Sequence, residues 1–336
     1  MLEQKLEPLI IKIDKMLDIM KKIAILTRDC AGVNAAIRSV VRTALIHDIE
    51  VVGILKGYEG LINGDIVFLD HRSVSGIINK GGTILKTSRS KNFYLESGQL
   101  KAVKTIKENN IDGLIVIGGN GSLTAANILS SKFHIPVVGV PATIDNDISG
   151  VELTIGADTA INVALDALDK IRDTATSLER IFIVEVMGRS CGYIALNVAL
   201  SGGCEEVLVP EREIDLNSMC DEIIKGNTKG KISWIIIVAE GKATAKQIAD
   251  IINQRTGLET RIAVLGHIQR GGSPTATDRF LGARMGNFAV ECLLNGKKGI
   301  CVTIENNENG FLPLEAAIKP KKIDVEKYYR LVKILT

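Results

Sequence analysis

The chain has 336 residues, of which 46% are hydrophobic and only 4% aromatic, so it is long enough for two domains with aliphatic cores. Its formal net charge of +2 excludes an overall basic field that would draw nucleic acid or a membrane surface, so any anion site must be local. The six cysteines are scattered without a CxxC pair, which argues against structural zinc and favours a reduced, cytoplasmic setting.

Residues 1–19 are predicted to be a separate N-terminal extension. Apolar residues at helical spacing predict an amphipathic helix that starts near Pro8, either loosely attached or binding a partner. Met20 directly precedes a strand pattern and offers a second, more natural start of translation, which would leave residues 1–19 untranslated. Lys12 and Asp14 interrupt the early apolar stretch, so it is not typical of a secretory signal, and no apolar run approaches the roughly 20 residues of a membrane span.

From Met20 onward, strand and helix patterns alternate, which predicts an α/β fold with parallel sheets covered on both faces. The predicted strands are 23–27, 51–55, 114–118, 136–140, 181–186, 233–239 and 262–266. The predicted helices are 34–48, 98–109, 158–174, 190–200 and 275–294.

The glycine-rich segment from Gly118 to Ser122 follows the apolar strand pattern of residues 114–118 and marks the start of another helix. Backbone amides at such a turn, with a helix dipole behind them, suit a phosphate group. The next strand is followed by Pro-Ala-Thr-Ile-Asp-Asn-Asp, which places Asp145 and Asp147 two residues apart. Acids at the carboxyl end of a parallel strand point into the ligand-binding crevice of α/β proteins, although such residues also make simple turns.

Basic residues also follow predicted strands. Arg189 follows the strand at 181–186, and His267 and Arg270 follow the strand at 262–266. Arg89 lies in another glycine-containing loop. Each of these residues alone is typical of a surface charge, but together they indicate a site for a phosphorylated ligand, because the planar guanidinium matches phosphate oxygens.

Taken together, these segments resemble the bacterial-type 6-phosphofructokinases of the phosphofructokinase A family. The similar segments are Gly-Gly-Asn-Gly-Ser, Thr-Ile-Asp-Asn-Asp, Glu-Val-Met-Gly-Arg and Leu-Gly-His-Ile-Gln-Arg-Gly-Gly-Ser-Pro-Thr, in the family's order from about Met20 to about Pro320. Lipid and NAD kinases share a similar glycine turn but lack the Thr-Ile-Asp-Asn-Asp and Gly-His-Ile-Gln-Arg segments.

The resemblance implies two Rossmann-like three-layer domains with mostly parallel sheets and an active site in the cleft between them. The larger, donor-nucleotide domain would comprise 20–156 and 269–319. The smaller, sugar-phosphate domain would comprise 157–268 and 320–336.

The resemblance also implies transfer of the γ-phosphate of ATP to the 1-hydroxyl of fructose 6-phosphate, in glycolysis. Asp145 would take the hydroxyl proton, and Asp147 would assist through charge and metal. Thr143 and Arg189 would steady the transferring phosphoryl group, with Arg89 on the donor phosphates. The implied donor site is Arg89, Ser90, Gly119, Asn120, Gly121 and Ser122, with Mg²⁺ held by Asn120 and Asp147.

The sugar phosphate would be bound by Thr143, Asp145, Met187, Gly188, Arg189, Glu240, His267 and Arg270. Arg180 and Arg261 match family positions that reach the site from a neighbouring subunit, which implies a homo-oligomer, typically a tetramer. An effector site for a nucleotide diphosphate or phosphoenolpyruvate would comprise Arg38, Arg42, Arg172, Glu205, Lys229 and Lys231. His71 and Gly76 depart from the family's effector pattern, and a basic rim at a subunit interface is an equally good interpretation of these residues.

Three departures lie on the donor side. The first loop reads Thr-Arg-Asp-Cys-Ala-Gly-Val-Asn, so two glycines are missing and Arg28 offers charge where the family has backbone freedom. Asn120 replaces an aspartate that helps to hold magnesium, which predicts weakened metal binding. Ala142 stands where ATP users have glycine and pyrophosphate users lysine.

Gly121 and Ala142 both lack the side chains of pyrophosphate users, so ATP is the favoured donor. Two alternatives stay open: a pyrophosphate-dependent phosphofructokinase, and a catalytically weak paralogue that acts as a regulatory or ligand-binding subunit.

Overall fold

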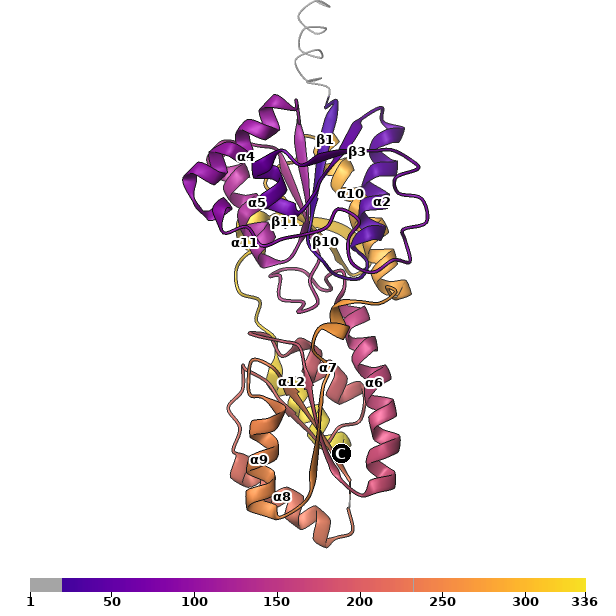
Figure 1. Ribbon diagram of the computed structural model, residues 1–336, viewed down its shortest axis with the longest axis vertical. Coiled ribbons are helices and arrows are strands. Elements are labelled where there is room, and N and C mark those ends of the chain that lie inside the picture. Colours follow the sequence, from indigo (N-terminus) through magenta and orange to yellow (C-terminus); the bar gives the residue numbers. More distant parts are fainter. Residues whose placement is uncertain (1–19, 232) are drawn as a thin grey trace, which may run out of the picture.

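The computed structural model describes residues 20–231 and 233–336, and the predicted helix in residues 1–19 lies outside this part of the chain. Two lobes are stacked along the long axis of the molecule, and each is built around one sheet (Figure 1). The fold is α/β with mostly parallel sheets, as predicted. No helix in the described ranges has the length and apolar character needed to cross a membrane.

The upper lobe in Figure 1 contains a seven-stranded sheet in the order β11-β10-β5-β4-β1-β2-β3. Its five central strands are parallel, and the edge strands β3 and β11 are antiparallel to their neighbours. The strands are β1 Lys22–Thr27, β2 Glu50–Ile54, β3 Ile66–Leu69, β4 Gly113–Gly118, β5 Val137–Pro141, β10 Ile300–Glu305 and β11 Glu308–Pro313. The helices are α2 Val33–Ile46, α3 Gly57–Asn63, α4 Glu96–Glu108, α5 Asn120–Phe133, α10 Ala276–Leu294 and α11 Leu314–Ala317, with the short 3-10 turn η1 Asn92–Tyr94.

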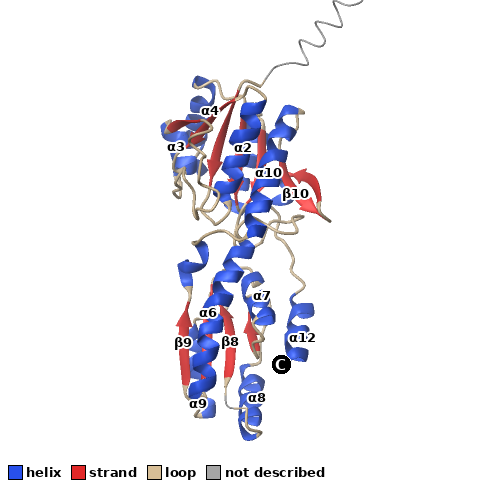
Figure 2. Ribbon diagram, turned by 90° about the vertical axis from the view of Figure 1, so that its right-hand side faces the viewer, coloured by secondary structure: helices blue, strands red, loops and turns tan. Residues whose placement is uncertain are grey.

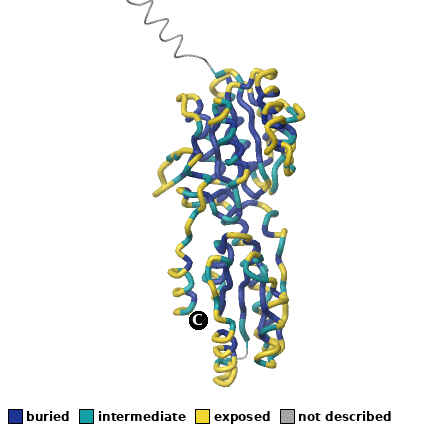
Figure 3. The backbone as a smooth tube through the Cα atoms, turned by 90° about the vertical axis from the view of Figure 1, so that its left-hand side faces the viewer, coloured by how far each residue is buried: buried dark blue, intermediate teal, exposed yellow. Residues whose placement is uncertain are grey.

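Strand β1 shows how both faces of this sheet are covered. Ile23 and Ile25 belong to the core cluster that includes α2 and α10, whereas Ala24 and Leu26 belong to the cluster that includes α3, α4 and α5. Because side chains alternate along a strand, an uninterrupted apolar run fills both cores at once. This is why the central strands appear dark blue, and the outer helices are partly yellow, in Figure 3.

The lower lobe contains a four-stranded, fully parallel sheet in the order β7-β8-β6-β9. Helices α6, α7 and α12 pack on one face and α8 and α9 on the other (Figure 2). The strands are β6 Ile181–Val186, β7 Glu206–Leu208, β8 Trp234–Ala239 and β9 Thr260–Val264. The helices are α6 Ala157–Leu178, α7 Tyr193–Ser201, α8 Leu216–Thr228, α9 Ala245–Thr256 and α12 Val325–Leu335, with the 3-10 turn η2 Gly266–Arg270.

Some elements differ from the sequence prediction. The strand predicted at 262–266 runs over 260–264, because residues 266–270 instead form the turn η2. The prediction missed the edge strands β3, β7 and β11, and it also missed β10, which lies between β11 and β5. It also missed α3, α8, α9, α11 and α12. The β10–β11 turn uses Asn306 and Asn307, both with positive φ (49° and 62°), which is the conformation that Asn favours in two-residue hairpins.

Candidate active site

A cleft of about 480 Å³ lies where the two lobes meet. Residues that follow β1, β4, β5 and β6, together with Arg270 in η2, line it. The carboxyl ends of both sheets therefore open into one cleft, as is usual for ligand sites in α/β proteins.

The loop after β5 carries the two carboxylates. Asn146 between them is buried and has a left-handed φ of 48°. Its Nδ2 donates to the Glu152 carbonyl (3.0 Å), and its Oδ1 accepts from the Thr154 amide (3.0 Å). Asn146 thus holds the loop through its buried side chain, while its two neighbours in the sequence, Asp145 and Asp147, line the cleft.

The surroundings of Asp145 favour its neutral form. Burial, and next the negative charge of Asp147, raise the pKa of Asp145 to about 6, while Arg270 and Arg189 act in the opposite direction. The Asp145 amide donates to Thr143 Oγ1 (3.2 Å), and the Cys191 thiol donates to the Asp145 carbonyl (3.0 Å). A carboxylate with a pKa near 6 is well suited to accept a proton at neutral pH.

The glycine turn after β4 forms the other wall. Helix α5 starts at Asn120, so the amides of Asn120 and Gly121 have no intrahelical partner and are available to an anion, whereas the Ser122 amide donates to the Gly119 carbonyl (2.9 Å). Tyr58 supports this turn, because its hydroxyl donates to the Ser122 carbonyl (2.7 Å). A Cβ on Gly118 would lie 2.7 Å from Ser122 Cβ, so glycine is required for the turn to pack.

Asn120 and Asp147 meet across the cleft wall and offer oxygen atoms to a cation. Asn120 Nδ2 donates to Asp147 Oδ2 (2.7 Å). In the described part of the chain, the buried Asn120 Oδ1 and Asp147 Oδ1 accept no hydrogen bond. Two unpartnered oxygens fit a hard cation such as Mg²⁺. Among the described residues, no group of three or more His, Cys, Asp or Glu side chains could hold a metal, so the cation would also need ligand or water oxygens.

Arginines from both lobes line the same cleft: Arg28 and Arg89 from the upper lobe, Arg189 after β6 and Arg270 in η2. Arg189 Nε lies 3.6 Å from Glu240 Oε1. The two groups form an ion pair, but the distance is too long for a hydrogen bond, and among the described residues the buried Glu240 Oε1 has no hydrogen-bond partner. The weak pairing leaves Arg189 able to bind an anion.

Four predicted sugar-phosphate residues lie beside the cleft and do not line it, namely Met187, Gly188, Glu240 and His267. The Met187 side chain is buried, and its amide donates to Gln269 Oε1 (2.8 Å). His267 is exposed in the same turn as Arg270. All other predicted catalytic and donor residues line the cleft: Thr143, Asp145, Asp147, Arg89, Ser90, Gly119, Asn120, Gly121 and Ser122, together with Arg189 and Arg270.

Arg180 and Arg261 lie away from the cleft of their own chain. Arg180 precedes β6 and Arg261 is the second residue of β9, so both sit at the amino ends of parallel strands whose carboxyl ends face the cleft. A six-residue strand separates these ends by roughly 20 Å. Both arginines pair with Glu259, Arg180 at 2.8 Å.

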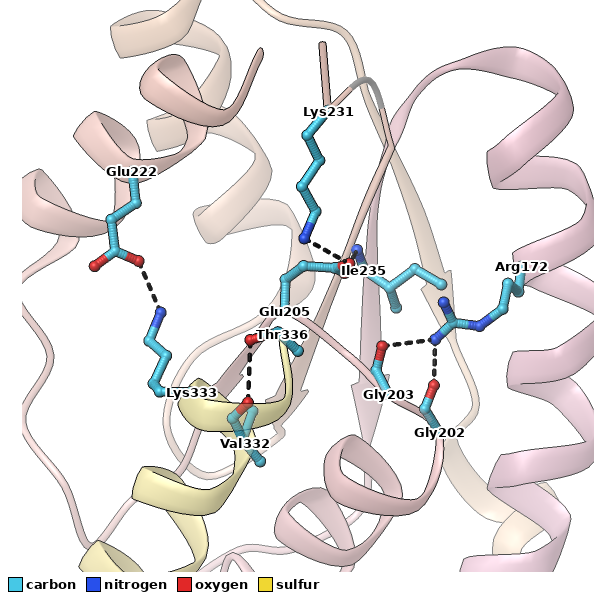
Figure 4. A network of polar contacts seen from close by, with 10 residues as sticks. All are labelled: Arg172, Gly202, Gly203, Glu205, Glu222, Lys231, Ile235, Val332, Lys333 and Thr336. Atoms are coloured by element: carbon cyan, nitrogen blue, oxygen red, sulfur yellow. Dashed lines mark hydrogen bonds and ion pairs between the residues drawn. The ribbon is translucent and has the colours of Figure 1, made fainter. Parts of the chain in front are cut away.

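The predicted effector residues form two groups. Arg172, Glu205 and Lys231 lie together at the far end of the lower lobe (Figure 4). Lys231 Nζ pairs with Glu205 Oε1 (3.1 Å), and Arg172 donates to the carbonyls of Gly202 and Gly203. Lys229 ends helix α8 nearby in sequence, whereas Arg38 and Arg42 belong to α2 of the upper lobe. One chain does not bring the two groups together.

The sequence prediction missed several residues that line the cleft, namely Tyr58, Lys91, Phe93 and Tyr94. Tyr58 lies in α3, four residues after the end of β2, and the same strand-end rule that singled out Asp145 would have found it. The segment at 91–94 gave no such signal, because it lies in the long connection between β3 and α4.

The chain is similar to known proteins over most of its length. The profile of the phosphofructokinase family matches residues 22–293. An ATP-dependent 6-phosphofructokinase of Thermotoga petrophila is 50% identical over 319 residues, which is 94% of this chain and 100% of that protein. One of Clostridium botulinum strain Loch Maree is 48% identical with the same coverage. A solved structure of phosphofructokinase from Saccharomyces cerevisiae is 34% identical with a TM-score of 0.82; it covers 89% of this chain, which spans 45% of the yeast chain.

Proposed function

Since the chain belongs to the phosphofructokinase family, we propose that it is an ATP-dependent 6-phosphofructokinase, which transfers the γ-phosphate of ATP to the 1-hydroxyl of fructose 6-phosphate. The reaction belongs to glycolysis, and we place it in the cytoplasm. All six cysteines are buried and unpaired, which suits a reducing compartment.

One observation carries this proposal: the paired carboxylates, the glycine turn and four arginines open into a single cleft. Asp145 is the proton acceptor, since its pKa of about 6 makes it basic enough to help and ionised at neutral pH. When the sugar hydroxyl loses its proton to Asp145, its oxygen attacks the γ-phosphorus and ADP leaves. Arg189 and Thr143 steady the transferring group, because phosphoryl transfer depends on alignment and charge neutralisation.

Asn120 Oδ1 and Asp147 Oδ1 are the protein oxygens that we assign to Mg²⁺. When bound, the ion would neutralise charge on the donor phosphates. The hydrogen bond between Asn120 and Asp147 fixes the direction of both side chains before any ligand arrives.

Space at Gly121 supports ATP as the donor. A Cβ on this exposed residue would meet only the Tyr94 hydroxyl, at 3.9 Å, so the cleft is open where a nucleotide must pass. Ala142 is buried at the end of β5 and adds no charge to the cleft. The donor phosphates would lie against the Gly119–Ser122 turn, Arg89 and Ser90.

The sugar phosphate would bind between Arg270, His267, Glu240 and the Met187–Arg189 turn. We further propose that Arg180 and Arg261 complete this site in the neighbouring subunit of a homotetramer, because they cannot reach the cleft of their own chain. The two groups of effector residues would likewise be joined across an interface, where a nucleotide diphosphate or phosphoenolpyruvate would bind.

The decisive experiment is a coupled assay for fructose 1,6-bisphosphate with wild type and Asp145→Asn, each with magnesium ATP or pyrophosphate. We expect ATP-dependent turnover by wild type that falls by about 10³-fold or more in Asp145→Asn. Turnover with pyrophosphate alone would contradict the proposed donor. Absence of turnover with either donor would contradict the proposed function.

A further inference from the structure

Arg28 directly follows β1 and contacts two other segments of the upper lobe, β4 and the loop at 87–88. Its amide donates to the Ile117 carbonyl (2.9 Å), which continues the pairing of β1 with β4. Its Nη1 donates to Thr87 Oγ1 (3.1 Å) and to the Ser88 carbonyl (2.9 Å). The guanidinium is therefore held in one direction, on the loop that also carries Arg89.

In this orientation the Arg28 guanidinium lies at the end of the cleft that we assign to the phosphate donor. A Cβ on Gly118 would lie 3.0 Å from Arg28 Cγ, so the Arg28 stem covers the turn that leads into α5. Arg28 lines the cleft together with Asn120. A guanidinium has five N–H donors, and within residues 20–231 and 233–336 only Nη1 of Arg28 is used. Donors remain for a ligand.

The charges around Arg28 call for an anion. Burial, and then the positive charges of Arg270 and Arg89, lower the pKa of Arg28, while Asp29 raises it. In the part of the chain that the structure describes, none of Arg28, Arg89, Lys91 and Arg270 has a carboxylate within ion-pair distance. The Arg270 Nε is also buried without a hydrogen-bond partner there. These four cations repel one another, which favours the binding of a polyanion.

Asn120 shifts the charge of the donor end in the same direction as Arg28. Its amide gives the donor end one carboxylate fewer than a pair of aspartates would, so the site attracts a divalent cation less strongly. With Arg28 present, the donor end gains a positive charge that is covalently part of the protein.

We propose that Arg28 and Asn120 act as a compensating pair, in which Arg28 binds the donor polyphosphate directly and supplies charge neutralisation that a more acidic site would obtain from a metal ion. This inference rests on the proposed function, because it concerns the phosphates of the same donor. Its consequence is that ATP binds to this protein without Mg²⁺.

The test measures binding in EDTA, by isothermal titration calorimetry, with ATP and with inorganic tripolyphosphate. We expect wild type to bind both, and Arg28→Ser to bind both about 10- to 100-fold more weakly, because a charge-assisted contact is lost. Arg28→Lys keeps the charge and should retain part of the affinity. Lys101→Gln removes one positive charge from the exposed side of α4 and should bind like wild type.

Asn120→Asp tests the other half of the pair. The new carboxylate repels metal-free ATP, so binding in EDTA weakens by about tenfold, whereas the Mg²⁺ concentration that gives half-maximal ATP binding decreases. In Arg28→Ser this Mg²⁺ concentration increases instead. The two variants thus move metal dependence in opposite directions.

Unchanged metal-free binding in Arg28→Ser would overturn the inference, and so would a wild type that binds no ATP in EDTA. Thermal denaturation of each variant shows whether it folds. If Arg28→Ser does not fold, metal-free ATP binding by Arg28→Lys tests the inference instead. The proposed function fails separately: a wild type with Arg28-dependent ATP binding but no phosphorylation of fructose 6-phosphate would overturn the activity alone. Turnover by wild type with Arg28-independent binding would overturn the inference alone.

Discussion

Asp145 is held in surroundings that oppose its negative charge. Its carboxyl is partly buried and lies near Asp147, and these two causes raise its pKa from an ordinary 3.8 to about 6. The residue that we propose as the proton acceptor therefore also makes folding less favourable at neutral pH, and the two effects can be measured separately.

The first prediction concerns the pH dependence of activity. Because only the ionised carboxylate accepts a proton, kcat/KM should fall as the pH is lowered through about 6. In Asp147→Asn a neighbouring negative charge is lost, so the acid limb of the residual activity should move to lower pH. A limb that stays in place in Asp147→Asn would contradict the assigned cause.

The second prediction concerns stability. Since the folded-state pKa of Asp145 is raised, the associated stability is fully present below about pH 4 and is lost as the pH rises through about 6. Asp145→Asn should thus be inactive yet more stable at pH 8, by up to about 3 kcal/mol. Urea unfolding at pH 8 and pH 4.5 measures this gain, which should shrink at the lower pH. Asp166→Asn, on the exposed side of α6, should show no such gain.

At the scale of elements, Asp278 connects α10 of the upper lobe to the start of α6. This fully buried carboxylate accepts from the Gly156 and Thr159 amides, both at 2.8 Å, and from the Thr159 hydroxyl. Burial raises the pKa of Asp278, but the three donors and the α6 dipole favour its charge. The side chain fixes where the long helix between the lobes begins.

The third prediction follows from these contacts. Asp278→Ala leaves buried donors without an acceptor, so the free energy of unfolding should decrease by about 1–3 kcal/mol. The matched control is Asp166→Ala on α6, the helix whose start Asp278 contacts; loss of the exposed Asp166–Lys170 pair should cost less than about 0.5 kcal/mol. Equal urea midpoints for the two variants would exclude a capping role for Asp278.

At the scale of the whole molecule, one core cluster runs through both lobes. It includes α2 and α10 above, α6 at the junction, and α7 and α12 below. Figure 3 shows buried backbone continuing through both lobes. Helix α6 begins at this junction and packs along the lower lobe (Figure 1). The amino ends of the lower sheet, with Arg180 and Arg261, remain on the outside.

The fourth prediction tests the site shared between subunits. Asp145→Asn lacks the proton acceptor that we propose, and the double variant Arg180→Ser/Arg261→Ser lacks the contacts that we assign to the neighbour's site. Each alone should be slow, because neither has a complete site. Hybrids from co-expression should regain activity, with about a quarter of the sites complete in an equal mixture. Two differently tagged chains, purified in tandem and assayed at saturating and low fructose 6-phosphate, provide the measurement.

Hybrids that remain as slow as their parents would contradict a shared site. The control hybrid combines an Asp145→Asn chain with an Asp147→Asn chain. Both carboxylates belong to the cleft of their own chain, so every site in this mixture lacks one of them and we expect no recovery.

The amino-acid sequence by itself determined the class of fold and many of the residues that line the cleft. Uninterrupted apolar runs such as Ile23–Leu26 predict central parallel strands, and strand-end positions such as Asp145 and Arg189 predict where a ligand binds, because both follow from local chain order. The short edge strand β3 and the amphipathic α12 were missed, since their identity depends on the neighbour that each one covers.

Only the tertiary structure decided how these residues act on one another. Asn120 and Asp147 form a hydrogen bond between segments that are distant in the chain, and the contacts that orient Arg28 are of the same kind. The raised pKa of Asp145 likewise depends on its burial in the folded protein. The location of Arg180 and Arg261 at the far end of the sheet has the same origin. Sequence spacing specifies which side chains lie at strand ends. Their protonation and contacts depend on burial and on the distances between segments, and both are set only when the sheets and helices pack.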